Sequence, residues 1–244
     1  MNNFSFIFCL AGKGSRFVSR GYDIPKFLLP LPNGRTILEQ SLISMNMEFC
    51  TELLVVLNED LKHHSNRVEE IIKQFCASSK VILTGNTIGQ AETAAIGANN
   101  LSKSQPFFIF NGDTILLNRK VGDYSKFLNL GDNKLVGFID RFKSNSLNYS
   151  YIQSSSGNIV SKIAEKMLIS NSATSGLYGF SSPEIYLNNY DDTNFASNEF
   201  YVSDIYNKLI NENYLIKTGQ LFSSKETIVL GTPEEYEKNK FKFV

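Results

Sequence analysis

The first half of the sequence repeats one pattern, in which a short, continuous run of apolar residues is followed by a segment with helical spacing. The apolar runs lie at 4–10 (FSFIFCL), 52–58, 80–85 and 106–113. The segments with helical character lie at 36–47, 61–76 and 89–101. Apolar runs without polar alternation are typical of strands covered on both faces. Strand–helix alternation of this kind predicts an α/β fold with a mostly parallel, doubly wound sheet, whose ligands bind beyond the carboxyl ends of the strands.

The second half of the sequence has a different texture, with strand-like runs separated by turns. These runs lie at 135–140, 149–155, 158–166, 172–180, 214–219 and 226–231, and a Ser-Gly-Asn turn joins the second to the third. Helical stretches lie near 182–189 and 203–212, and a closing helix begins at Pro233. Since no linker rich in Pro, Gly or Ser divides the chain, we predict a single domain, 1–244, with a small β-rich lobe.

Charge and cysteine content exclude several classes of protein. Lys and Arg number 24 and Asp and Glu number 24, and this balance argues against bulk binding to nucleic acid or to an acidic membrane. No apolar run approaches the ~20 residues of a membrane span, and the first residues lead directly into a glycine turn, unlike a signal peptide. The three cysteines and two adjacent histidines lack the spacing of a zinc site or a disulfide framework. We therefore expect a cytoplasmic protein that binds neither nucleic acid nor membrane.

A glycine turn and a group of basic residues follow the first apolar run, where residues 9–30 read CLAGKGSRFVSRGYDIPKFLLP. Gly12 and Gly14 allow a sharp bend that presents backbone N–H groups to an anion. Arg16 offers a rigid fork for phosphate oxygens, and Pro25 restricts the direction of the compact positive charge on Lys26. This grouping predicts a site that holds a polyphosphate close to a second anion.

Other interpretations of this turn fit less well. A dinucleotide-binding fingerprint needs a third glycine where Phe17 stands, and the GxxxxGK spacing of a P-loop is absent. A plain turn with solvated basic side chains is the alternative. Farther along, Asp113 ends an apolar run, where a carboxylate can hold Mg²⁺ together with phosphate and water. A helix N-cap or turn aspartate is the alternative at that position.

The stretch LAGKGSRF…GYDIPKFLLPLPNGRTIL resembles the signature of bacterial nucleotidyltransferases that activate sugar phosphates, with Lys13 where the family often has glycine. The resemblance implies a Rossmann-like nucleotidyltransferase fold, with a nucleotide-binding half at about 1–134 and an acceptor-binding half at about 135–244. It implies Mg²⁺ on Asp113 and catalytic roles for Arg16 and Lys26. The nucleotide-binding residues that it implies are Leu10, Ala11, Gly12, Gly14, Ser15, Gln90 and Gly112.

Gln90 stands where the family has a Gln near the base, and its amide could read a base edge because it both donates and accepts. A surface helix residue is the alternative. Ala91-Glu92-Thr93 replaces the usual glycine-threonine pair at that point, so the base is left open.

IAEK (163–166) and TSGLYGF (174–180) resemble the acceptor-binding strands of the family, and EFYVSDIYNKL (199–209) resembles a segment written EYYLTD in relatives. The residues implied to bind the acceptor are Glu165, Lys166, Gly176, Glu199 and Asp204. A solvated strand face for the Glu-Lys pair and helix capping for the last two are the alternatives.

One departure from the family concerns the metal. Some relatives have an aspartate, a second metal ligand, at the position where Val229 stands. The sequence leaves two ligand sets open for the metal: Asp113 with phosphates and water, or Asp113 with a further carboxylate from Asp204 or Glu226.

The resemblance implies transfer of a nucleoside monophosphate from an NTP, with CTP or UTP favoured, to a phosphorylated acceptor, with release of pyrophosphate. A sugar 1-phosphate for surface (capsular) polysaccharide is the expected acceptor, and phosphocholine or a phosphorylated amino acid such as phosphoglutamine is the alternative that a cytidylyltransferase would use. Relatives often form homo-oligomers. A nucleotide-sugar-dependent glycosyltransferase would show a DxD element, but residues 111–115 read NGDTI. A non-catalytic nucleotide-binding regulator would tolerate the loss of Lys26 or Asp113.

Overall fold

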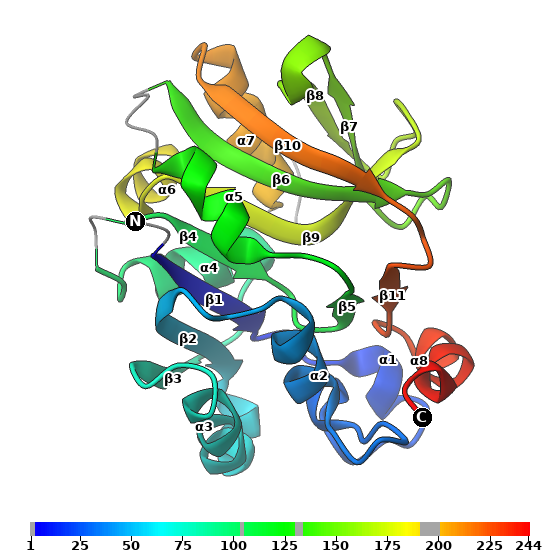
Figure 1. Ribbon diagram of the computed structural model, residues 1–244. Coiled ribbons are helices and arrows are strands. Elements are labelled where there is room, and N and C mark those ends of the chain that lie inside the picture. Colours follow the sequence, from blue (N-terminus) through cyan, green and yellow to red (C-terminus); the bar gives the residue numbers. More distant parts are fainter. Residues whose placement is uncertain (1–2, 103–104, 130–133, 191–200) are drawn as a thin grey trace.

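A central sheet with helices on both faces organises the chain in the computed structural model, which describes residues 3–102, 105–129, 134–190 and 201–244 (Figure 1). Along the main path the strands follow the order β10 (Leu215–Phe222), β6 (Leu135–Lys143), β9 (Ser172–Phe180), β4 (Phe107–Phe110), β1 (Phe4–Leu10), β2 (Cys50–Asn58) and β3 (Ser79–Thr84). The hairpin of β7 (Ser150–Ser154) and β8 (Val160–Glu165) joins this sheet through β9.

Strand direction changes at β9. The pairs β1–β2, β1–β4, β2–β3 and β6–β10 are parallel, whereas β9 runs antiparallel to both β4 and β6. Between Ile139 and Arg141 the β6–β9 register shifts, so that Ser175, Gly176 and Leu177 face the single residue Asp140. Such bulges re-aim side chains next to functional sites, and this one lies over the edge where β4 ends.

Apolar residues on alternate positions of the strands make two cores, one on each face of the sheet. Phe4, Phe6 and Phe8 face one side, where α2 (Ile37–Ser44), α3 (Ser65–Lys73) and α5 (Val121–Leu128) pack. Ile7 and the second face of β2 pack against α4 (Gln90–Ala98), α6 (Pro183–Asn189) and α7 (Val202–Asn211). Figure 1 shows α5 in front of the sheet and α4 and α7 behind it. Burial on both faces explains why the parallel strands read as continuous apolar runs.

The C-terminal segment returns to the first half of the chain. β11 (Thr227–Val229) pairs antiparallel with β5 (Thr114–Leu116), and α8 (Pro233–Asn239) follows directly (Figure 1). Ile228, Leu230 and Tyr236 form an apolar cluster with Phe17 of α1 (Ser15–Val18) and with Ile115. Residues 226–244, which the sequence grouped with the second half, thus pack against α1, the short helix that follows the glycine turn of the first half.

The α/β fold with a mostly parallel, doubly wound sheet is confirmed, and the structure differs from the sequence-based elements in several places. The segment 61–76 is a 3-10 turn (Glu59–His64) followed by the shorter α3. The run 106–113 contains β4 only up to Phe110, because Gly112 turns the chain at a φ of 69°. The helix α5 was not predicted.

Candidate active site

A cavity of about 1120 Å³, here called the central cavity, lies beyond the carboxyl ends of β1 and β4 and is closed by β7, β8 and β9. Eight of the residues singled out from the sequence line it: Gly12, Arg16, Lys26, Gln90, Asp113, Glu165, Lys166 and Gly176. These residues come from both halves of the chain, so the fold brings the glycine turn and the strands β8 and β9 to one place.

The glycine turn begins where β1 ends. Gly14 has a φ of 61°, a left-handed conformation that favours glycine, and its carbonyl accepts the first hydrogen bonds of α1. Gly12 has no heavy atom within 4 Å of the position a Cβ would take, so the backbone is open to a ligand there. Arg16 is exposed, lines the central cavity and makes no ion pair with any described residue. Its guanidinium is available for an anion.

Lys26 and Asp113 form an ion pair at the floor of the cavity, with 2.5 Å between Nζ and Oδ2. Lys26 opens a 3-10 turn directly after Pro25, whose φ of −55° sets the direction of the chain. Asp113 is 7% exposed and follows the turn at Gly112, where a Cβ would come within 2.9 Å of Leu10. Both the left-handed backbone conformation and the close packing therefore favour glycine at position 112. Gly112 itself does not line the cavity.

The N-terminus of α4 forms one wall of the central cavity. Gln90 is the first residue of this helix, and its Nε2 is buried without a hydrogen-bond partner among the described residues. Thr87 and Thr93 line the same wall and bond each other through their hydroxyls at 2.8 Å. Glu92 accepts from the backbone N–H of Ile88 and so serves the local backbone. This wall can offer a free amide donor beside a helix N-terminus, which suits a polar ring next to phosphate.

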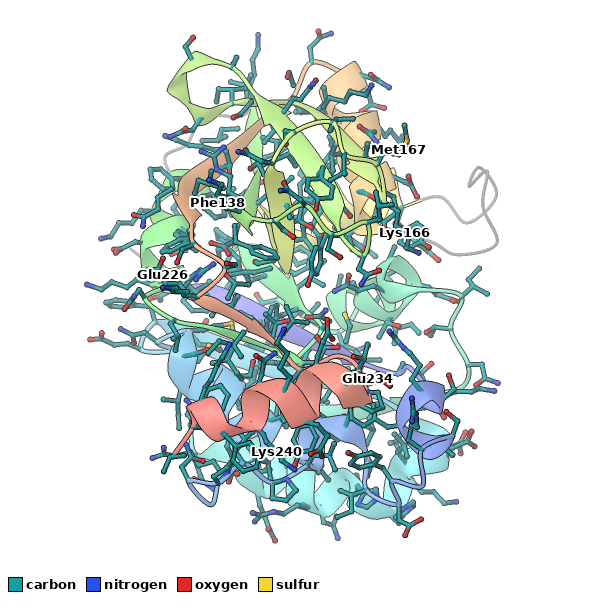
Figure 2. All side chains as sticks on the ribbon, turned by 90° about the vertical axis from the view of Figure 1, so that its right-hand side faces the viewer. Phe138, Lys166, Met167, Glu226, Glu234 and Lys240 are labelled. Atoms are coloured by element: carbon teal, nitrogen blue, oxygen red, sulfur yellow. The ribbon has the colours of Figure 1, made fainter. Side chains whose placement is uncertain are left out.

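The opposite wall holds the pair Glu165–Lys166 at the end of β8. The carboxylate of Glu165 accepts a hydrogen bond from Ser150. Lys166 has a φ of 52° and donates from Nζ to the hydroxyl of Tyr201 at 2.9 Å. Figure 2 shows Lys166 on the side of the β-rich half that faces the rest of the molecule. Gly176 lies beside these residues, and a Cβ there would meet Asn111 at 3.1 Å.

Tyrosines line the side of the cavity that holds Glu165 and Lys166. Burial raises the pKa of Tyr149 to about 12, with a further contribution from the negative charges of Glu235 and Asp113. Burial likewise raises the pKa of Tyr178 to about 12. Both phenols therefore stay protonated at neutral pH and act as hydrogen-bonding groups rather than as bases. Together with Tyr201 they form an aromatic surface around Glu165 and Lys166.

Three buried polar atoms that line the central cavity lack a hydrogen-bond partner among the described residues. They are Nε2 of Gln90, Oδ1 of Asn111 and Oγ of Ser203. Ser203 is only 2% exposed. A buried polar group without a partner costs about 1–3 kcal/mol, so these three atoms are placed to bond a ligand that enters the cavity.

Several of the predicted site residues do not line the central cavity: Leu10, Ala11, Gly14, Ser15, Gly112 and Asp204. Leu10 and Ala11 are buried at the end of β1, and the Ala11 carbonyl accepts from Asn58. Asp204 lies in the first turn of α7, and burial raises its pKa while a backbone hydrogen bond from Tyr201 lowers it. Glu199 lies outside the described residues.

Other lining residues were missed in the sequence: Asn111, Asn148, Tyr149, Ser150, Tyr178, Tyr201, Ser203 and Glu235. Asn111, Tyr201 and Ser203 lie inside the quoted motifs, but only the neighbouring charges drew attention. Glu235 follows Thr232 by three residues, which is the pattern of a capping box and gives no sign of a cavity.

The donors available for a cation are carboxylates. Among the residues that the structure describes, no group of three or more His, Cys, Asp or Glu side chains could hold a metal ion. Asp113 and Glu235 both line the central cavity and both influence Tyr149. One or two carboxylates completed by phosphate and water suit Mg²⁺.

Comparisons with known proteins agree with this arrangement. The family model for nucleotidyl transferases matches residues 7–221. The nucleoside-diphosphate-sugar pyrophosphorylase from Vibrio cholerae RC9 is 25% identical and has a TM-score of 0.81, and the match covers 96% of this chain and 98% of that one.

Two further solved structures share the fold at 15% identity. A UDP-glucose pyrophosphorylase complexed with UDP-glucose has a TM-score of 0.78, with 99% of this chain and 98% of that chain covered. The inositol-1-phosphate CTP transferase from T. maritima has a TM-score of 0.72, with 100% and 96% covered. A comparison with curated protein sequences found no significant match.

No helix in the described parts of the chain has both the length and the apolar character needed to span a membrane. The family match extends from β1 to β10 and includes the glycine turn, Asp113 and the strands β8 and β9. The chain belongs to the nucleotidyl transferase family.

Proposed function

We propose that this protein transfers a nucleoside monophosphate from an NTP to a phosphorylated small-molecule acceptor and releases pyrophosphate. The observation that carries this proposal is the meeting of Arg16, Lys26 and Asp113 with Glu165 and Lys166 around one central cavity of about 1120 Å³. A cavity of this volume is large enough to hold an NTP and a small phosphorylated acceptor together. Its cationic side chains lie on both walls, as two phosphorylated substrates require.

In the proposed reaction an acceptor phosphate oxygen attacks the α-phosphorus of the NTP. A new phosphorus–oxygen bond forms as the bond to pyrophosphate breaks. The attacking phosphate is already ionised, so no general base is needed, and alignment and charge neutralisation supply most of the catalysis.

The residues around the cavity have separate roles in this scheme. The glycine turn and Arg16 hold the triphosphate, and Arg16 stabilises the departing pyrophosphate. Lys26 leaves Asp113 to bind the α-phosphate or the acceptor phosphate, and Lys166 assists at the acceptor. Mg²⁺, when bound with Asp113 as a ligand, supplies further neutralisation of the phosphate charge. Gln90, with its free Nε2, contacts the base.

CTP or UTP is the proposed nucleotide, since Gln90 offers both a donor and an acceptor to a pyrimidine edge. A sugar 1-phosphate is the proposed acceptor, for the synthesis of a surface polysaccharide. The T. maritima neighbour is named as a CTP transferase for inositol 1-phosphate, and the Vibrio cholerae neighbour as a pyrophosphorylase for nucleoside-diphosphate sugars. Phosphocholine or a phosphorylated amino acid is the alternative acceptor, because the tyrosines can contact a cationic group.

Pyrophosphate release tests the proposal. CTP, UTP, dTTP, GTP and ATP are each incubated with Mg²⁺ and with sugar 1-phosphates, phosphocholine or phosphorylated amino acids. Release that requires one nucleotide and one acceptor together supports the transferase and identifies both substrates. Folded protein that binds nucleotide yet releases no pyrophosphate with any pair contradicts it, and transfer from a nucleotide sugar without pyrophosphate would identify a glycosyltransferase.

A further inference from the structure

Glu235 brings a second carboxylate to Asp113. The position that a Cβ would take at Gly231 is 3.0 Å from Oδ2 of Asp113 and 3.6 Å from Oε2 of Glu235. The two carboxylates therefore face one small space, which a larger residue at position 231 would fill. Lys26 forms an ion pair with Asp113, whereas Glu235 is half-buried and has no ion pair with a described residue.

A comparison within the chain shows that Glu235 is not used as a cap. The helices α2 and α8 both begin with Thr-x-x-Glu. In α2 the carboxylate of Glu39 folds back and accepts from the backbone N–H of Thr36 at 2.6 Å, which completes a capping box. In α8 only the N–H of Glu235 is bonded, to the hydroxyl of Thr232. No hydrogen bond or ion pair joins the Glu235 carboxylate to another described residue, so it is available to a ligand.

The other carboxylates that could accompany Asp113 are placed elsewhere. Glu226 is bound by Ser223 and Asn118 and does not line the central cavity. Figure 2 shows it on the opposite side of the molecule from Lys166 in that view. Asp204 does not line the cavity either. Val229 does line it, on β11, but carries no donor atom.

Hydrogen bonds on three sides fix the segment that carries Glu235. The N–H of Leu230 donates to the carbonyl of Asp113 at 2.8 Å, and β11 pairs with the strand that follows Asp113. Tyr236 donates from its hydroxyl to the carbonyl of Pro30 at 2.6 Å. Because the two carboxylates belong to segments that are bonded to each other, their separation is built into the fold.

Independent atoms indicate that the same cavity is arranged for a ligand. Oδ1 of Asn111, two residues before Asp113, and Oγ of the 2% exposed Ser203 are buried without partners among the described residues. Both residues line the central cavity. The carboxylate pair thus lies in a cavity that also presents buried polar atoms able to bond a ligand.

We propose that Glu235 is the second carboxylate that holds a divalent cation together with Asp113, in place of the aspartate that some relatives carry at the position of Val229. This proposal rests on the proposed function, in which phosphate oxygens complete the coordination. The ligand set, two carboxylates with phosphate and water, is one that Mg²⁺ and Mn²⁺ use.

Binding of Mn²⁺ alone, followed by the electron paramagnetic resonance signal of the free ion, tests the proposal without turnover. Glu235→Gln removes one negative charge and keeps the size of the side chain, and we expect it to weaken Mn²⁺ binding by about 10-fold or more. Glu234→Gln is the matched control, because Glu234 is the adjacent residue, is 64% exposed at its side chain and pairs with Arg20. We expect the control to bind Mn²⁺ like the original protein.

A rescue experiment separates lost coordination from a disturbed fold. Val229→Asp in the Glu235→Gln background returns a carboxylate to the cavity from β11, and we expect it to restore Mn²⁺ binding. Unchanged Mn²⁺ binding by Glu235→Gln, or no Mn²⁺ binding by the original protein, overturns the proposal. If pyrophosphate release fails for every substrate pair while Glu235→Gln still loses Mn²⁺, the proposed function falls and the cation site stands.

Discussion

At the scale of single residues, Lys26 connects the parts of the proposed site. Its ammonium group lies 2.5 Å from Asp113 and lines the same cavity as Arg16 and Lys166. Release of Asp113 by Lys26, when a phosphate arrives, would exchange one ion pair for another within the cavity. Charge-assisted hydrogen bonds of this kind are roughly twice as strong as neutral ones.

Lys26→Ala should leave the fold intact and reduce kcat by about 100- to 1000-fold, because a donor aimed at developing charge is lost. Lys13→Ala is the control, since Lys13 is exposed on the same turn and does not line the cavity. Steady-state pyrophosphate release and the melting temperature are measured for both variants. Full activity of Lys26→Ala would remove Lys26 from the catalytic scheme.

Two buried serines offer a matched test of ligand contact. Ser203 and Ser172 both have hydroxyls without partners among the described residues, but only Ser203 lines the central cavity. Ser203→Ala should weaken substrate binding by about 5- to 10-fold, which is the loss of one neutral hydrogen bond. Ser172→Ala should leave KM unchanged, and neither change should lower stability. Equal KM values in the two variants would show that Ser203 makes no contact with substrate.

At the scale of elements, a buried ion pair fastens the C-terminal strand to the sheet. Asp140 lies on β6 and Arg119 precedes α5, and the side chains of both are fully buried. Nε of Arg119 is 3.3 Å from Oδ2 of Asp140. Arg119 also donates to the carbonyl of Glu226 at 2.5 Å and to the hydroxyl of Thr227 at 2.6 Å. Asp140 accepts from Tyr124, and its bond with Ser175 leads to the bulge of β9. One network thus positions both β11 and the cavity wall.

Arg119→Met should lower the free energy of unfolding by about 3–5 kcal/mol, because it leaves the carboxylate of Asp140 buried without its cation. The double variant Arg119→Met, Asp140→Leu should regain much of this loss, since neither charge is then left alone. Urea unfolding measures both. A single variant as stable as the original protein would show that the pair does not hold β11 in place.

The elements were predicted from sequence more completely than the site was. Continuous apolar runs identified the parallel strands because burial on both faces leaves a direct trace in the residues. The helix α5 was missed although its buried residues Val121, Tyr124 and Leu128 have the i, i+3, i+7 spacing of an amphipathic helix. The segment has only eight residues and contains Gly122, a poor helix former, so its helical pattern is short and weak.

At the site, charged residues in dense motifs could be found and their neutral neighbours could not. Arg16, Lys26 and Asp113 stand out because their chemistry is unusual beside glycine turns and apolar runs. Asn111 and Ser203 are ordinary polar residues until the fold buries them against a cavity. Glu235 was missed because its sequence context is that of a capping box. Only the structure shows that its carboxylate does not fold back onto Thr232.

At the scale of the whole molecule, buried tyrosines link stability to alkaline pH. Burial raises the pKa of several tyrosines in both halves of the chain: Tyr124, Tyr149, Tyr178, Tyr186 and Tyr206. Below a pH of about 10 both the folded and the unfolded states keep these phenols protonated. Above it the unfolded state loses protons first, so unfolding becomes more favourable as pH rises toward the folded-state pKa values.

We therefore expect the free energy of unfolding to fall above a pH of about 10, by up to about 1.4 kcal/mol per pH unit for each buried tyrosine. Urea unfolding at a series of alkaline pH values measures this slope. Tyr206→Phe removes one fully buried phenol and should make the slope shallower. A slope that Tyr206→Phe leaves unaltered would place the alkaline sensitivity elsewhere.

Because β11 and α8 return to the first half, a newly made chain can complete the proposed cation site only after these two segments have been made. The ribosome delivers β1 to β10 first, whereas Ile228, Leu230 and Tyr236, which cover Phe17 and Ile115, are made after them. Until then Asp113 lacks both the backbone bond from Leu230 and the neighbouring carboxylate. A chain cut before β11 would keep most of its strands and lack one half of the proposed cation site.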